Sequence, residues 1–207
     1  MHRVVLLLSM TTLLLACSIS SACSPREIIL SSDAADEVRH ALGYVLAPTY
    51  LPKGLEFLDV HIPEIPSSTA VPYPPPPVVS LTYSSSGDEL GAHVLLVMYP
   101  NTWPPYFEGP SNLQTPEDAI SESTVKHRTA YVVRGMWSEE VQSALRETGE
   151  VPVDPEWDYI TATSLQFALD LPGGETIGVM LAVIPNPAAW ISDTELVRIA
   201  ESFRFVE

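Results

Sequence analysis

The clearest pattern in the chain is an alternation of apolar and polar residues near its C-terminal end. Apolar side chains occupy every second position in residues 165–171 and again in residues 177–183, with Gly173 and Gly174 between the two runs. A period of two places one side of a strand in a core, and paired glycines permit the tight reversal of a hairpin. The sequence therefore predicts an antiparallel hairpin with one buried face.

Helical spacing is present in three other segments, residues 32–45, 138–148 and 192–203, which carry apolar residues three and four positions apart. Ser or Asp side chains suited to N-capping stand at their starts. We expect the first helix to include Val45 and to stop at Pro48, and the second to end at Gly149. The third helix is expected to pack on the buried face of the hairpin, and residues 203–206 to add an edge strand.

The remaining strands are expected between turns that are rich in proline and glycine. Their expected positions are residues 57–62, 78–83, 92–99 and 125–134. The second and third of these form a hairpin, and Gly135 ends the last one. Pro116 and the acids after it predict a helical turn. The proline run at residues 72–77 lacks amide donors, so we expect an extended connection there, outside the sheet.

The N-terminal segment has the pattern of a bacterial lipoprotein export signal. Arg3 precedes apolar runs at residues 4–8 and 13–15, and Ala16 and Cys17 follow. The cation stays on the cytoplasmic side, the apolar run enters the bilayer, and the small Ala16 suits a peptidase that cleaves before Cys17. The end of this segment resembles the lipobox, which implies a lipid on Cys17. Cys23, after a second run of small residues, is the alternative lipidation site.

These patterns together predict an exported protein with one folded domain. Residues 1–16 are the expected lipoprotein signal peptide, residues 17–32 a flexible tether, and residues 33–207 a single α+β domain. In that domain we expect a curved antiparallel sheet with N- and C-terminal helices packed on it. The protein is expected to be lipid-anchored to the cell membrane or outer membrane, facing the periplasm or the exterior.

The charge balance narrows the class of partner. The chain has 26 acidic and 10 basic residues, a formal net charge of -16. Such a field repels phosphate backbones and anionic lipid headgroups, so nucleic acid is not an expected partner. The membrane is then contacted through a covalent lipid rather than through charge. The two cysteines lie in or just after the signal, which leaves the domain without a thiol for catalysis or for an internal disulfide.

Catalytic and metal-binding patterns are not evident. No serine stands in a Gly-x-Ser-x-Gly elbow, and His40, His61, His93 and His127 are spread over separate elements. We therefore expect no enzyme activity, no metal centre and no cofactor. A divergent hydrolase remains an alternative that a tight cluster of Ser, His and carboxylate would support. The acids of residues 154–158 are an alternative calcium site, although they lack the glycine spacing of a known loop.

Several segments resemble the bacterial envelope family called domain of unknown function 4367. The resemblance rests on the segments that enter or form strands and on the C-terminal helix, namely residues 50–54, 79–83, 128–133, 165–183 and 192–202. It spans most of residues 45–207 and implies an envelope protein without catalytic residues. The chain departs from the family in its proline-rich loops and in the segment between Trp137 and Trp157, so a binding surface there would be its own.

Aromatic residues in these departing segments are the candidate binding residues. They are Trp103, Tyr106, Phe107, Trp137 and Trp157, with Tyr73 in the proline run. Flat rings on loops stack on sugars or grip peptides, and they also pin long loops to a core. We expect them to contact an envelope protein or a glycan.

A different function class is a lipid or lipoprotein carrier with an apolar cavity. The two hypotheses differ in the exposure of four apolar side chains, those of Leu165, Phe167, Val179 and Leu181. A carrier requires these side chains to line an open pocket, whereas an interaction module leaves them sealed beneath the C-terminal helix.

Overall fold

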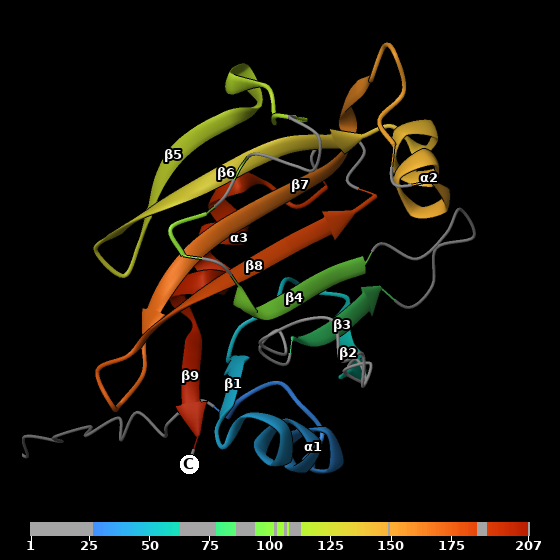
Figure 1. Ribbon diagram of the computed structural model, residues 1–207. Helices are drawn as coiled ribbons and strands as arrows, with labels where there is room; N and C mark the ends of the chain where they lie inside the picture. The colour runs from blue at the N-terminus through green and yellow to red at the C-terminus, as the bar shows by residue number, and fades with distance from the viewer. Residues whose placement is uncertain are drawn as a thin grey trace, which may run out of the picture.

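The computed structural model describes residues 27–62, 78–85, 94–101, 103–105, 107, 113–148, 150–185 and 190–206 of the 207-residue chain. Within these residues the main body is a curved, open, antiparallel sheet of seven strands (Figure 1). In spatial order they are β2 (Leu55–His61), β3 (Val79–Ser85), β4 (Val94–Asn101), β8 (Thr176–Ile184), β7 (Trp157–Asp170), β6 (Arg128–Trp137) and β5 (Ile120–Val125). The α+β fold expected from the sequence is confirmed.

The hairpin expected from the alternating pattern is formed by β7 and β8. Leu165 pairs with Leu181, and Asp170 pairs with Thr176 at the turn. Gly174 occupies the left-handed region with φ of 84°, where a side chain would be strained. Leu165, Phe167 and Leu181 are fully buried, as the period of two predicts.

The C-terminal helix α3 (Asp193–Glu201) covers that buried face from behind the sheet in Figure 1. The Ser192 hydroxyl caps it by accepting a hydrogen bond from the Glu195 amide, 3.3 Å away. Its residues Leu196 and Ile199 are fully buried. Directly after the helix, Phe203 packs edge-to-face on Phe167 with ring centroids 5.6 Å apart. The expected packing of this helix on the hairpin is therefore present.

The N-terminal helix α1 (Ser32–Leu42) begins where the sequence predicts but ends earlier. The Ser31 hydroxyl accepts a hydrogen bond from the Ala34 amide, and Gly43 ends the helix with φ of 80°. The expectation that Val45 continues this helix to Pro48 is wrong. Val45–Pro48 forms the strand β1, which pairs with β9 (Phe203–Val206) in a separate two-stranded sheet. That pairing joins two segments far apart in the sequence.

The folded body begins before the expected end of the tether at Ser32. Ile28, Ile29 and Leu30 pack against the core, and the Ile29 amide donates a 2.8 Å hydrogen bond to the Pro48 carbonyl. The Ile29 carbonyl accepts a hydrogen bond from the buried Tyr83 hydroxyl. Burial raises the pKa of Tyr83, so this hydroxyl stays protonated and donates. These contacts extend the folded part to Ile28.

The expected single strand over residues 125–134 is two strands. β5 ends at Val125, and β6 begins at Arg128. Lys126 and His127 make the turn with φ of 48° and 66°, although neither is a glycine. Contacts with a distant segment hold this turn: the Lys126 amide donates to a Glu201 carboxylate oxygen at 2.6 Å, and Lys126 Nζ donates to the Phe203 carbonyl at 2.8 Å.

Gly135 does not end β6, contrary to expectation. The strand continues to Trp137, with a register shift between Arg134 and Met136. The helix α2 (Glu139–Glu147) then follows, capped by Ser138, as expected. The helical turn predicted after Pro116 is the short 3-10 helix η2 (Glu117–Ala119). Within the described residues, no helix is both long and apolar enough to cross a bilayer.

Candidate functional site

The structure divides the candidate aromatic residues between two places. Trp137, at the end of β6, lies opposite Trp157, at the start of β7, as a register pair. Trp103 and Phe107 instead contact Tyr131 in the middle of β6, with ring centroids 6.2 Å and 5.5 Å from it. Tyr73, Tyr106, Cys17 and Cys23 lie outside the described residues, as does the proline run at residues 72–77.

Trp103 and Phe107 serve packing in this arrangement. Tyr131 belongs to β6, the strand between β7 and β5 (Figure 1). Phe107 meets Tyr131 at an angle of 76°, an edge-to-face contact, and both Trp103 and Phe107 are half-buried. Farther along the chain, Leu113 is 6% exposed. The rings of Trp103 and Phe107 therefore pack against the sheet at Tyr131.

Trp137 and Trp157 form a row with Tyr159, a residue that the sequence analysis missed. The Trp137 and Trp157 centroids are 5.0 Å apart with planes at 89°, and Trp157 and Tyr159 are 6.4 Å apart with planes at 70°. Tyr159 is 49% exposed. Because side chains two apart in a strand share a face, its spacing from Trp157 was the available signal. We call Trp137, Trp157 and Tyr159 the aromatic row.

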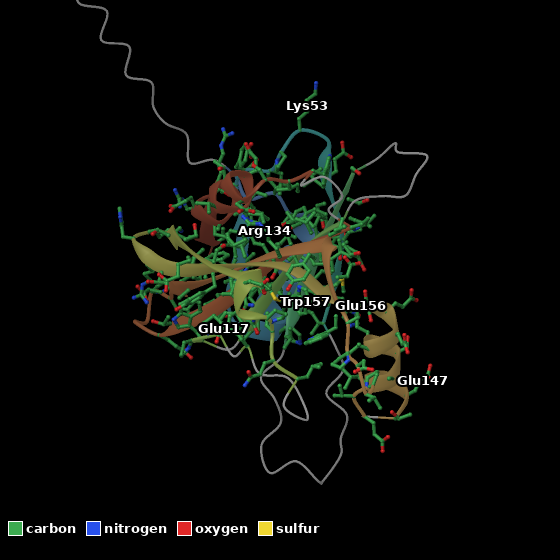
Figure 2. The ribbon with its side chains drawn as sticks, turned by 90° about the horizontal axis from the view of Figure 1, so that it is seen from above. Lys53, Glu117, Arg134, Glu147, Glu156 and Trp157 are labelled. Atoms are coloured by element: carbon green, nitrogen blue, oxygen red, sulfur yellow. The ribbon has the colours of Figure 1, made fainter. Side chains whose placement is uncertain are left out.

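A bulge in β6 fixes the central ring of the row. Gly135 has φ of 97° at the register shift, and a Cβ atom placed on it would lie closer than 3.0 Å to Trp157 Nε1 and to the Asp158 carbonyl oxygen. The absent side chain lets Trp157 Nε1 reach the Arg134 carbonyl and donate a 3.0 Å hydrogen bond. Figure 2 shows Arg134 and Trp157 in this part of the molecule.

Asp158 stabilises the turn of backbone that carries the row. Its carboxylate accepts hydrogen bonds from the Ile160 amide at 2.8 Å, from the Thr161 amide at 3.2 Å and from the Thr161 hydroxyl. The hydroxyl of Thr161, followed by the Ile160 amide, lowers the pKa of Asp158, which therefore stays ionised. The Tyr159 hydroxyl donates to Asp118, and this bond raises the Tyr159 pKa.

Two hollows adjoin the row. One, of about 400 Å³, is lined in part by Trp137, Glu139 and Gln142. The other, of about 380 Å³, is lined in part by Glu156, Trp157 and Tyr159. Ser138 and Asp158 line both. Ile160, at the rim of the second hollow, is 73% exposed. The end of the sheet beside α2 thus presents the exposed ring of Tyr159, two half-buried tryptophan rings, apolar surface and carboxylates together.

The apolar face of the hairpin is closed. Leu165, Phe167 and Leu181 have no exposed area, and Val179 is 1% exposed. The side chains that a carrier would use to line a cavity are therefore covered by α3 and its neighbours.

The described histidines and carboxylates do not converge. His40 is on α1, His61 on β2 and His127 in the turn between β5 and β6, while His93 lies outside the described residues. In the described part of the chain, no group of three or more His, Cys, Asp or Glu side chains could hold a metal ion. The acids of residues 154–158 form no such group.

Comparison with protein-family models, with curated proteins and with solved structures found no match to this chain. The resemblance to domain of unknown function 4367 stays a prediction from the sequence.

Proposed function

We propose that this chain is a non-enzymatic, lipid-anchored protein of the cell envelope that acts as an interaction module through the aromatic row. One observation carries the proposal: Trp137 at the end of β6 and Trp157 and Tyr159 at the start of β7 form one partly exposed surface. Rigid rings with both apolar faces and polar edges are common anchors of protein interfaces. A hydrogen bond holds Trp157 in place without a ligand, which lowers the entropy cost of binding.

The position of the anchor supports this function. Ten residues separate Cys17 from Ile28, the first residue packed on the core. Fully extended, this length of chain spans about 40 Å at most, so a lipid on Cys17 holds the domain near the bilayer. The described chain enters the body beside α1 and β1, whereas α2 and the aromatic row lie at the other end of the sheet (Figure 1). An anchored domain can therefore turn the row away from the membrane.

A lipid or lipoprotein carrier is the alternative function, and it requires an open apolar pocket. The closed face of the hairpin favours the interaction module, because Leu165, Phe167 and Leu181 are already covered within the chain itself. Opening that face would expose most of the core that stabilises the domain.

Replacing Cys17 with alanine is expected to release the protein from membranes. Wild-type protein in a bacterial host should sediment with membranes and leave them only in detergent, because two or more acyl chains hold a protein stably at a bilayer. The Cys17→Ala variant has no thiol to receive the lipid and should move to the soluble fraction. Immunoblotting of the membrane and soluble fractions measures this shift.

The matched control for that experiment is Cys23→Ala. It should remain with the membranes if Cys17 carries the lipid. If Cys23→Ala is released and Cys17→Ala is not, the second cysteine is the lipidation site. If neither substitution changes the fractionation, the proposed lipid anchor is wrong.

A further inference from the structure

The chain segment that carries the aromatic row is strongly acidic. Between Trp137 and Thr161 the sequence has one cation, Arg146, and seven carboxylates. These are Glu139, Glu140, Glu147, Glu150, Asp154, Glu156 and Asp158. All except Asp158 are exposed. Figure 2 shows Glu147 and Glu156 on the flank that carries α2. Seven carboxylates and one cation give this segment a strongly negative net charge.

The carboxylates border the hollows beside the rings. Glu139 lines the hollow that contains Trp137, and Glu156 lines the one that contains Trp157 and Tyr159. Elsewhere on the described surface, acids such as Asp170 and Asp193 are paired with Arg128 and Arg134. Around the row, aromatic rings and exposed carboxylates are thus combined. A positively charged side chain gains from both, since a cation is attracted to the face of an aromatic ring as well as to a carboxylate.

The orientation of the rings distinguishes between a cationic peptide and a sugar chain. Successive planes in the row turn by 89° and 70°. A linear glycan stacks on rings whose faces lie along one plane, and an acidic glycan would also be repelled here. An ammonium or guanidinium group is compact and needs only one ring face at a time. Each hollow, at about 400 Å³ or 380 Å³, has room for the end of one long side chain.

From this combination we infer that the aromatic row binds a segment of a partner protein that is rich in arginine and lysine, with cationic side chains against Trp157 and Tyr159 and in reach of Glu139 and Glu156. The inference rests on the proposed function and names the chemistry of its partner. The Asp158 carboxylate is already occupied by hydrogen bonds of its own turn, so its role is to hold the turn. The exposed acids beside it attract the partner.

The test measures binding of a labelled peptide of alternating arginine and glycine to the purified full chain in neutral detergent, by fluorescence anisotropy at about 0.1 M salt. The double variant Glu139→Lys with Glu156→Lys should weaken binding about tenfold or more, because it reverses one charge at each hollow. The matched control, Glu37→Lys with Glu56→Lys, makes the same change in net charge at exposed positions on α1 and β2. It should change the affinity less than about twofold, since those sites are remote from the row.

A third variant tests the rings. Tyr159→Leu keeps apolar bulk at a half-exposed position and removes the ring face, so binding should weaken about threefold. Equal weakening by the two double variants would overturn the inference, because the peptide would then sense only net charge. Unchanged binding by Tyr159→Leu would overturn the role of the rings. Binding of a chitin oligosaccharide that depends on Tyr159 and not on Glu139 or Glu156 would replace the peptide with a glycan.

These outcomes are independent of the anchor. Fractionation of Cys17→Ala decides whether the chain is held at a membrane, whereas the anisotropy measurement decides what its exposed end recognises. A lipid-anchored chain that fails to bind the cationic peptide would leave the anchor intact and remove the inferred partner class.

Discussion

The Leu181→Asp variant is expected to be unfolded at room temperature. Leu181 has no exposed area, and it pairs with Leu165 on one side and Val97 on the other, both fully buried. An aspartate there would bring a charge, or a carboxyl without partners, into the centre of the core. The expected loss is about 5 kcal/mol, comparable with the whole stability of many domains. Circular dichroism during heating would show no cooperative transition.

The control for this experiment is Leu58→Asp. Leu58 lies on the edge strand β2 and is 63% exposed, so the same chemical change is solvated there. Its cost should stay below about 1 kcal/mol. A Leu181→Asp protein that melts like the wild type would mean that the hairpin face is in contact with water. That result would reopen the hypothesis of an apolar carrier cavity.

Replacing Gly135 with alanine is expected to destabilise the domain and to displace the aromatic row. At φ of 97° a Cβ atom is strained in any surroundings, and here it would also overlap Trp157 Nε1 and the Asp158 carbonyl. The backbone cannot move to relieve this overlap without breaking the pairing of β6 with β7. The expected loss is about 3 kcal/mol or more. Tryptophan fluorescence should shift, because Trp157 would lose its hydrogen bond to Arg134.

Gly174→Ala separates the two contributions to this effect. Gly174 has a similar φ of 84°, but nothing lies within 4 Å of an added Cβ. The Gly174→Ala variant should therefore lose only the free energy of unfolding that the unfavourable φ costs, about 1 kcal/mol. Its fluorescence spectrum should be unchanged. Equal losses of stability in the two variants would show that the close contact with Trp157 does not exist in solution.

Elements whose determinants are local could be predicted from the sequence. The β7–β8 hairpin has an alternating pattern and paired glycines within 19 residues, and α3 has its capping serine directly before its apolar stripe. Both were found. The end of α1 was misplaced because Gly43 ends the helix before Pro48 is reached. The four buried residues of β1 show no alternation, and their partner is β9, more than 150 residues away.

The turn between β5 and β6 was missed for a related reason. Lys126 and His127 have none of the composition of a tight hairpin turn. Their positive φ values are stabilised by bonds from Lys126 to Glu201 and Phe203, which belong to the C-terminal segment. No local pattern encodes such contacts. The packing of Ile28 and Ile29 on the core depends on distant residues in the same way.

The candidate site was predicted in part. In the sequence Trp137 and Trp157 are separate aromatic residues that flank an inserted segment, and the register of β6 with β7 brings them together. Gly135 alone predicts the end of a strand, whereas in the structure it forms the bulge that positions Trp157. Trp103 and Phe107 had the same surroundings in the sequence, but their partner Tyr131 was only visible in three dimensions.

The central claim is that a lipid on Cys17 holds this domain at the membrane, and the mass of the N-terminal peptide tests it most directly. The full-length chain would be produced in a bacterial host, extracted from its membranes, digested and analysed by mass spectrometry. The account predicts a peptide that begins at Cys17 and carries acyl chains on that residue. A peptide that begins at Met1 and contains unmodified Cys17 would contradict it.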